Sequence, residues 1–244
     1  MELIAKYKKA HNKLVLLDYD GTLVNFTIKP DDAKPSERLL KVLSKISNDP
    51  ATKIMIITGR EYRSIDKLVG HLPIDIIAEH GAMLKENGSW KEQVNDAVFW
   101  KKGILPTLNE ITEKCPGSFI EDKGFSLAWH YRNCELEAGQ ACSRELIGLI
   151  DNTIHSYVLK ILDGNKVVEL LNKGIGKGKS VKNLVEQNNY DCILSIGDDK
   201  TDEEMFDVLK DNENSITIKV GEGATSAKFR LNTPENVLEL LELL

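Results

Sequence analysis

The chain has 244 residues, 41% hydrophobic and 29% charged, an ordinary composition for a soluble globular protein of one large or two smaller domains. Its formal net charge of -6 argues against a nucleic-acid partner, and no apolar run approaches the ~20 residues that a membrane span requires. The charged N-terminal stretch lacks an apolar signal core, and the four cysteines form no Cys-x-x-Cys pair. We therefore expect a cytoplasmic protein with reduced thiols and no membrane partner.

Strand and helix patterns alternate along the first third of the chain. Short apolar runs predict buried strands, and periodic apolar residues between them predict helices. The strands are expected at residues 14–17, 53–57 and 74–78, and the helices at about 35–46 and 61–70.

The same alternation returns in the last third of the chain. Strands are expected at residues 191–196 and 215–220, and helices at 179–187, at 201–210 and from Thr233-Pro234 onward. Strands interleaved with helices predict an α/β fold, a Rossmann-like, mostly parallel sheet with right-handed crossovers.

The middle of the chain has a different pattern. Residues 95–115 are predicted to be helical, and residues 125–131 alternate as in a half-buried strand. Asp-Gly-Asn at 163–165 separates two apolar runs, which predicts a hairpin. We therefore expect a small α+β module inserted at about residues 85–170, which leaves 1–84 and 171–244 as the core domain.

Two aspartates follow the first predicted strand. In LLDYDGTLV, Asp18 and Asp20 stand at its C-terminal end, where open parallel sheets place their ligand crevice. Gly21 can let the backbone turn sharply after them. A solvated turn is the alternative interpretation, since Asp and Gly are common turn residues, but the pattern favours function.

A hydroxyl side chain follows the second predicted strand. Thr58, in IITGR, can donate a hydrogen bond to a phosphate oxygen. The alternative is that Thr58 caps the helix that follows.

Acidic residues recur after residue 196, in SIGDDKTDEEMF. Asp198 and Asp199 end a strand, and adjacent acids there repel each other unless a cation neutralises them. Asp202 lies in the next helix, where residues 201–204 also match a capping box. Carboxylate oxygens are the ligands that Mg²⁺ takes in proteins, so these acids are candidate metal ligands.

The stretch GIGKGKS, residues 174–180, has the composition of a phosphate-binding loop. A P-loop needs four residues between its first glycine and Gly-Lys-Ser, and counting back from Gly178 places that glycine at Lys173. The spacing counts against a nucleotide site. A lysine that serves other phosphate chemistry and a plain Gly/Lys turn before a helix remain as interpretations.

Taken in order, these stretches resemble the four motifs of the haloacid dehalogenase-like phosphatases: DYDGT, the threonine of ITGR, the lysine of GKG, and GDDKTD. The resemblance implies the Rossmann-like core of that superfamily with an inserted α+β cap domain. It implies that Asp18 is the nucleophile, which forms an aspartyl-phosphate, and that Asp20 is the general acid and base. A carboxylate nucleophile splits hydrolysis into two easier steps, provided that its repulsion from the phosphate is suppressed.

The resemblance also implies the charges that suppress this repulsion. Lys177 stands in the lysine-glycine position and is the expected phosphate neutraliser, with Lys179 as the neighbouring candidate. Mg²⁺ is the implied cofactor. Its implied ligands are Asp18, the backbone carbonyl of Asp20 and Asp198, with Asp199 or Asp202 orienting its water molecules.

Within the superfamily, the sequence resembles the trehalose-6-phosphate phosphatases through nearly its whole length. The segments that carry the resemblance are AEHGA (78–82), SFIEDKGFSLAWHYR (118–132), GNKVVEL (164–170), GDDKTDEEMF and IKVGEGATSAKFRL. An E-x-K pair and a later glutamate in the cap of that family bind glucose hydroxyls, and they map onto Glu121, Lys123 and Glu169. An exposed hairpin turn is the alternative for the first two. Further candidates for sugar-phosphate contact are Arg60, His80, His130 and Arg132.

The resemblance predicts Mg²⁺-dependent hydrolysis of trehalose 6-phosphate, a small-molecule sugar phosphate. Three alternatives stay open: a related phosphatase of sucrose phosphate or a mannosyl phosphate, a catalytically silent phosphosugar-binding module, and a kinase built on GIGKGKS. The N-terminal stretch resembles the lead-in to the phosphatase half of fused synthase–phosphatase proteins, so a trehalose-6-phosphate synthase domain is an expected partner in the same chain or pathway.

Overall fold

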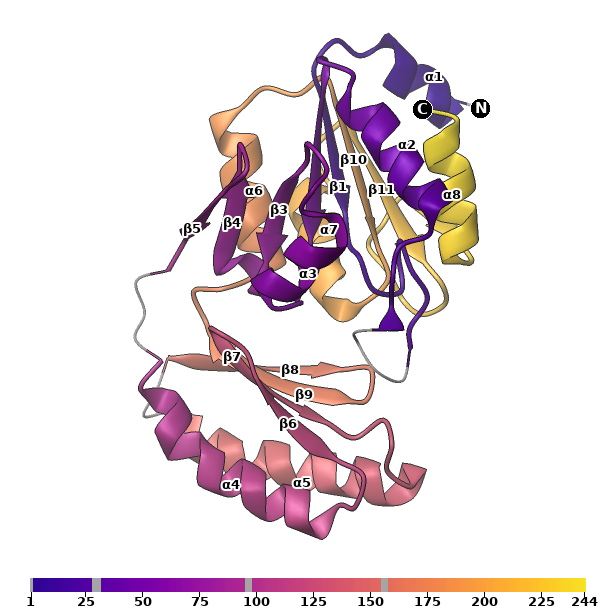
Figure 1. Cartoon of the computed structure of the whole chain (residues 1–244). Coiled ribbons are helices and arrows are strands. Elements are labelled where there is room, and N and C mark those ends of the chain that lie inside the picture. The colour runs from indigo at the N-terminus through magenta and orange to yellow at the C-terminus, as the bar shows by residue number, and fades with distance from the viewer. Residues whose placement is uncertain (1, 28–31, 95–97, 155–157) are drawn as a thin grey trace. The chain divides into compact units, whose positions relative to one another are not determined.

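The computed structural model describes residues 2–27, 32–94, 98–154 and 158–244 (Figure 1). The chain divides into two compact units, the core unit of Met1–Gln93 with Gly176–Leu244, and the insert unit of Val94–Ile175. The sequence pattern predicts an insert at about 85–170. The difference at the first boundary arises because two short strands after residue 82 join the sheet of the core unit.

The core unit contains an eight-stranded sheet of order β12-β11-β10-β1-β2-β3-β4-β5 (Figure 1). All neighbours from β12 to β3 are parallel, whereas β4 and β5 are antiparallel. The strands are β1 (Lys13–Leu17), β2 (Thr52–Ile57), β3 (Asp75–Ala78), β4 (Met83–Glu86), β5 (Ser89–Glu92), β10 (Cys192–Gly197), β11 (Ser215–Val220) and β12 (Phe229–Leu231). β1 pairs with both β10 and β2, so the residues that follow these three strands emerge at one edge of the sheet.

Helices cover this sheet because the buried strands present apolar side chains on both faces. Leu14 and Leu16 of β1 pack in one cluster with Val181 of α6 and Met205 of α7. On α2, the Arg38 guanidinium forms ion pairs with two glutamates of α8. The helices of this unit are α1 (Glu2–Lys9), α2 (Glu37–Ser47), α3 (Tyr62–Val69), α6 (Lys177–Gln187), α7 (Lys200–Leu209) and α8 (Pro234–Glu242), with a 3₁₀ turn at Glu79–Gly81.

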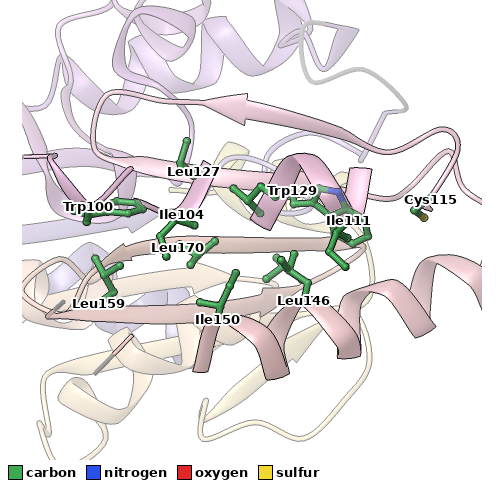
Figure 2. Close-up of a cluster of buried hydrophobic side chains, with 12 residues drawn as sticks. Trp100, Ile104, Ile111, Cys115, Leu127, Trp129, Leu146, Ile150, Leu159 and Leu170 are labelled. Atoms are coloured by element: carbon green, nitrogen blue, oxygen red, sulfur yellow. The ribbon is translucent and has the colours of Figure 1, made fainter. Parts of the chain in front are cut away.

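The insert unit contains an antiparallel sheet of order β6-β7-β9-β8 and two helices. Its elements are α4 (Trp100–Lys114), β6 (Phe119–Asp122), β7 (Ser126–His130), α5 (Leu136–Ile154), β8 (Leu159–Gly164) and β9 (Val167–Asn172). Leu127 and Trp129 of β7 are fully buried in a cluster with side chains of both helices (Figure 2). The other face carries Glu121, Ala128 and Glu169 as cross-strand neighbours on β6, β7 and β9. One face of this sheet is therefore apolar, and the other is partly polar.

The structure confirms an α/β fold with a mostly parallel sheet and an inserted α+β module. The hairpin predicted at Asp-Gly-Asn is the β8–β9 hairpin, and its turn residue Lys166 has a positive φ of 61°. The helix predicted at 95–115 begins at Trp100, and residues 95–97 lie outside the described part of the chain. Among the described helices, none combines the length and apolarity needed to cross a membrane.

Candidate active site

Three carboxylates gather where β1 and β10 end. Asp18 follows β1 directly, Asp198 follows β10, and Asp202 lies in the first turn of α7. One oxygen atom from each lies within 4.8 Å of the other two. Parallel pairing of β1 with β10 brings the first two together, and the turn into α7 brings the third. The site thus unites residues that are far apart in the sequence.

Lys177 lies within this carboxylate cluster. Its Nζ donates to Asp18 Oδ1 at 2.7 Å and to Asp202 Oδ1 at 2.8 Å, and the residue is only 2% exposed. Lys179 lies two residues later on α6 and is exposed. The structure therefore brings Lys177 to the carboxylates.

Burial and charge shift the ionisation of this cluster. Burial raises the pKa of Asp18 well above its usual range, and Lys177 offsets only part of this effect because Asp202 and Asp198 add negative charge. Burial, followed by the charge of Asp202, raises the pKa of Asp198 to about 7. Burial alone would lower the pKa of Lys177, but the charges of Asp18 and Asp202 outweigh it and raise that pKa. The acids outnumber the lysine, so the cluster favours an additional positive charge.

Asp202 holds the turn between β10 and α7. Its Oδ2 accepts from the backbone N–H groups of Asp198 at 2.9 Å and Asp199 at 3.0 Å, and its side chain is fully buried. Asp199 is the N-cap of α7, and Asp202 is the third helical residue of the capping box. The capping box predicted at residues 201–204 is wrong by two positions, because the helix begins at Lys200.

Two glycines allow the carboxylates to approach the backbone. A Cβ atom on Gly21, which has a φ of 85°, would lie 2.3 Å from Asp198 Oδ2. A Cβ atom on Gly197 would lie 2.3 Å from Asp202 Cγ. Since real Cβ contacts are never this short, both positions require glycine while the carboxylates keep their places.

Asp20 is held by Arg60. The Arg60 Nε and Nη2 atoms each lie 2.6 Å from one oxygen of the Asp20 carboxylate, a bidentate ion pair. The Arg60 guanidinium also lies 5.1 Å from the centre of the Tyr19 ring. Arg60, predicted as a substrate contact, thus forms an ion pair with Asp20 in the structure.

Thr58 and His80 lie in neighbouring loops of the core unit. Thr58 is buried, and its Oγ1 accepts from the backbone N–H of Arg60 at 3.1 Å. The N-cap of α3 is Glu61, so the alternative interpretation of Thr58 as that cap is wrong. The His80 backbone N–H donates to the Thr58 carbonyl at 3.0 Å. The imidazole ring of His80 packs against Gly59, where an added Cβ atom would lie 2.4 Å from His80 Nε2.

The carboxylate cluster fits a hard divalent cation. Asp18 Oδ2 is buried and has no hydrogen-bond partner among the described residues. The other donors of the cluster are carboxylate oxygens as well, which Mg²⁺ and Ca²⁺ prefer. Asp199 is not in the cluster, because its side chain accepts from the Lys200 backbone at the start of α7.

The insert unit carries a second polar group on the face of its sheet opposite the apolar cluster. Lys123 Nζ lies 2.9 Å from Glu169 Oε1, and Ser126 Oγ donates to the same oxygen at 2.5 Å. His130 Nε2 lies 2.8 Å from Glu121 Oε2. The structure thus pairs four of the five predicted sugar-binding residues of this unit.

Arg132, the fifth predicted residue, lies at the edge of this group. Its Nη2 donates to the backbone carbonyl of Asn165 in the β8–β9 turn at 2.8 Å.

The structure adds two site residues that the sequence patterns did not predict. Ser126 contacts Glu169, and Lys219 of β11 is buried and donates to the backbone carbonyl of Asp198. Ser126 follows the predicted strand alternation, which could have found it. Lys219 had no such signal, because a lysine within an apolar strand gives no indication of the carbonyl it contacts.

Comparison with known proteins places the chain in a family. The family model described as trehalose-phosphatase matches residues 16–235, which contain every residue of both polar groups. The chain belongs to the trehalose-phosphatase family. Among solved structures, the C-terminal domain of the trehalose-6-phosphate phosphatase of C. albicans is similar with a TM-score of 0.94 and 32% identity, over 99% of this chain and 94% of that one. This likeness confirms the predicted haloacid dehalogenase type of fold.

Longer relatives of the trehalose-phosphatase family also contain this region. An alpha,alpha-trehalose-phosphate synthase of Dictyostelium discoideum is 40% identical over 100% of the chain and 31% of its own length. A bifunctional trehalose-6-phosphate synthase/phosphatase of Thermoproteus tenax is 37% identical over 100% of the chain and 33% of its own length. The chain therefore spans about a third of the length of these relatives.

Proposed function

We propose that the chain is a phosphoric monoester hydrolase that converts trehalose 6-phosphate to trehalose and phosphate. The observation that carries this proposal is the buried Asp18, which has one oxygen bound by Lys177 and the other without a hydrogen-bond partner among the described residues. A carboxylate in this state can act as a nucleophile, and the lysine beside it can neutralise an incoming phosphate. Membership of the trehalose-phosphatase family supports the substrate.

In the proposed first step, an Asp18 carboxylate oxygen attacks phosphorus and the bond from phosphorus to the sugar oxygen breaks. Asp20, as general acid, gives its proton to the departing sugar oxygen. In the second step, water attacks the aspartyl-phosphate, Asp20 takes the proton of that water, and the bond from phosphorus to Asp18 breaks. Arg60 orients the Asp20 carboxyl group for both transfers. Thr58 donates a hydrogen bond to a phosphate oxygen.

We propose Mg²⁺ as the cofactor. Asp18, Asp198 and the backbone carbonyl of Asp20 would hold it, with Asp202 supporting the ligands through its bonds to the turn. When bound, a divalent cation neutralises phosphate charge and polarises the phosphoryl oxygens. Asp199 serves as the helix cap.

The polar group of the insert unit is proposed to bind the sugar. Glu121, Lys123 and Glu169 offer charged groups, which can hold several directional hydrogen bonds to hydroxyls. His130, Arg132 and His80 are proposed as further contacts to the sugar phosphate. A synthase domain in the same chain or pathway would supply the substrate, in keeping with the names of the longer relatives.

Phosphate release from a panel of sugar phosphates tests the proposal. The wild type and Asp18→Asn are compared with and without Mg²⁺, on trehalose 6-phosphate, sucrose phosphate, a mannosyl phosphate and a small aryl phosphate. We expect the wild type with Mg²⁺ to release phosphate mainly from trehalose 6-phosphate. EDTA or Asp18→Asn should abolish this release. Release from many substrates would support phosphatase activity but contradict trehalose 6-phosphate as the specific substrate. A folded protein that binds the sugar phosphate but releases none would indicate a silent binding module.

Sugar-binding variants test the assignment of the insert unit. Glu121→Gln and Glu169→Gln should lower turnover of trehalose 6-phosphate more than turnover of a small aryl phosphate, because only the sugar substrate uses these side chains. Equal losses on both substrates would count against the assignment.

A further inference from the structure

A buried lysine lies outside both polar groups, in the first turn of α4. Lys101 is 8% exposed, and its Nζ lies 2.6 Å from Asp122 Oδ1 and 3.0 Å from the Gly124 carbonyl oxygen. It also donates to the carbonyl oxygen of Lys123. An ammonium group has three donors, so the turn from residue 122 to 124 satisfies all of them.

The turn that Lys101 holds is the one that carries Lys123. Only Gly124 and Phe125 separate Lys123 from Ser126, and the Lys123 backbone donates to the Ser126 carbonyl at 3.1 Å. The side chains of Lys123 and Ser126 both meet Glu169 Oε1. The conformation of this short turn therefore fixes two of the three members of the Glu169 group.

The apolar core of the unit gives no reason for a buried ammonium at this position. Neighbouring positions of α4, such as Trp100 and Ile104, supply apolar contacts to that core. Burying an ammonium group is unfavourable until its partners compensate, and an apolar side chain avoids this cost. What Lys101 adds is a fixed orientation of two successive peptide groups, since charge-assisted hydrogen bonds to both carbonyls oppose rotation of the turn.

We propose that Lys101 is a positioning residue for sugar recognition, which holds the β6–β7 turn so that Lys123 and Ser126 keep Glu169 in its binding geometry. This inference rests on the proposed function of the polar group. In this role Lys101 does not contact the substrate. Loss of Lys101 should weaken binding of the sugar and leave the chemistry at Asp18 unchanged.

Steady-state kinetics of Lys101→Met on two substrates tests the proposal. Methionine keeps most of the length of the side chain and removes its charge and donors. We expect KM for trehalose 6-phosphate to rise on the order of tenfold, because a misplaced binding group costs that much or more, while kcat/KM for p-nitrophenyl phosphate stays within about twofold. Lys102→Met is the matched control, since Lys102 is adjacent on α4 and exposed; it should match the wild type on both substrates.

A second pair of variants separates positioning from stability. Thr112→Val removes the hydrogen bond from Trp129 Nε1, 3.1 Å long, on the apolar side of the sheet. It should lower the melting temperature of the protein without raising KM for trehalose 6-phosphate. Lys101→Arg keeps the charge, but its planar donors do not match three acceptors around one nitrogen, so we expect KM to rise at least about threefold even if Lys101→Met fails to fold.

The outcomes distinguish this inference from the proposed function. If the wild type does not hydrolyse trehalose 6-phosphate, the proposed function is wrong, and so is the proposed role of Lys101. A wild type that does so, with an unchanged KM in soluble Lys101→Met or Lys101→Arg, overturns the positioning role alone. An equal rise in KM in Thr112→Val also overturns it, because general loosening of the unit would then suffice.

Discussion

Asp18, Asp198 and Asp202 bring three carboxylates together, and two of them, Asp18 and Asp202, accept hydrogen bonds from Lys177. Burial, and after it the charges of the neighbouring acids, raise the pKa values of Asp18 and Asp198. A bound divalent cation relieves the part of this effect that comes from repulsion between the acids. Proton binding and cation binding therefore compete at this site.

This competition predicts a pH-dependent affinity for Mg²⁺. With the pKa of Asp198 at about 7, its carboxyl group is protonated below that pH and must lose the proton to bind the cation. We expect the affinity, measured by calorimetric titration of EDTA-treated protein, to fall by up to about tenfold per pH unit below pH 7. Asp198→Asn should bind weakly at every pH. A constant affinity between pH 5.5 and 8 would contradict the prediction.

The same raised pKa has a consequence for stability without the cation. A carboxyl group that binds its proton more tightly in the folded state contributes stability below its unfolded pKa of about 4, and this contribution is lost as the pH rises toward 7. We therefore expect Mg²⁺ to raise the melting temperature more at pH 8 than at pH 5.5, by roughly 5 °C. An equal rise at both pH values would be the contrary result.

Substitutions of Asp199 and Asp202 are predicted to have very different effects on kcat, although the two residues are close in sequence. Asp202 is buried and contacts Lys177, whereas Asp199 caps α7. Asp202→Asn removes the charge beside Lys177, so kcat should fall about a hundredfold or more. Asp199→Asn keeps a good helix cap, since Asn and Asp cap equally well, and kcat should change only a few fold. Comparable losses in both variants, measured at saturating Mg²⁺, would contradict these roles.

At the scale of elements, apolar runs and motif spacing predicted most of the core. Strands at 14–17, 53–57, 74–78, 191–196 and 215–220 are confirmed, because buried parallel strands are continuous apolar runs that need no tertiary context to be seen. The apolar pattern did not predict β4 and β5, because MLKE and SWKE both contain charged residues; β5 is the edge strand of the sheet and β4 lies beside it. Asn87 and Gly88, both with positive φ, join them in a hairpin, and this Asn-Gly pair was the available signal.

The candidate site could be predicted as a set of residues but not as contacts. Parallel strand ends placed Asp18 and Asp198 at the same sheet edge, as the sequence analysis expected. Sequence spacing does not define side-chain directions. It therefore did not predict the contact of Lys177 with Asp202 or the ion pair of Arg60 with Asp20. Whether Asp199 or Asp202 lies near the metal site depends on the residue at which α7 begins. Sequence patterns define helix ends only to within a few residues.

The packing of α6 on α7 explains the glycine that follows Lys177. A Cβ atom on Gly178 would lie 2.7 Å from the backbone oxygen and 2.8 Å from Cβ of Glu204. Gly178→Ala should push α6 away from α7 and displace Lys177, which we expect to destabilise the protein by about 1–3 kcal/mol and to lower kcat/KM about tenfold. Urea unfolding and steady-state kinetics measure the two effects.

A glycine in another helix provides the control of opposite sign. Gly148 of α5 is exposed, and a Cβ atom there meets nothing within 4 Å. Gly148→Ala should therefore stabilise the protein, by up to about 1 kcal/mol, because alanine is the better helix former. Destabilisation by both variants would indicate that crowding at Gly178 is not the cause.

At the scale of the whole molecule, each compact unit has an apolar core of its own. The insert unit buries Trp100, Trp129 and their neighbours in a cluster drawn entirely from residues 94–175 (Figure 2). The cluster around Leu14 and Phe206 draws only on the core unit. Because the insert is one continuous segment with a complete antiparallel sheet, its folding requires no strand from outside.

This independence predicts that residues 94–175 fold when they are expressed alone. Small domains with one core reach only about 3–5 kcal/mol of stability, so the fragment should unfold cooperatively at low urea concentration. Trp100 and Trp129 are both buried, and their fluorescence should shift to longer wavelength in that transition. Trp129→Ala in the fragment should abolish the transition, since removing a fully buried tryptophan costs about 3–5 kcal/mol. A wild-type fragment without a cooperative transition would mean that this core depends on the rest of the chain.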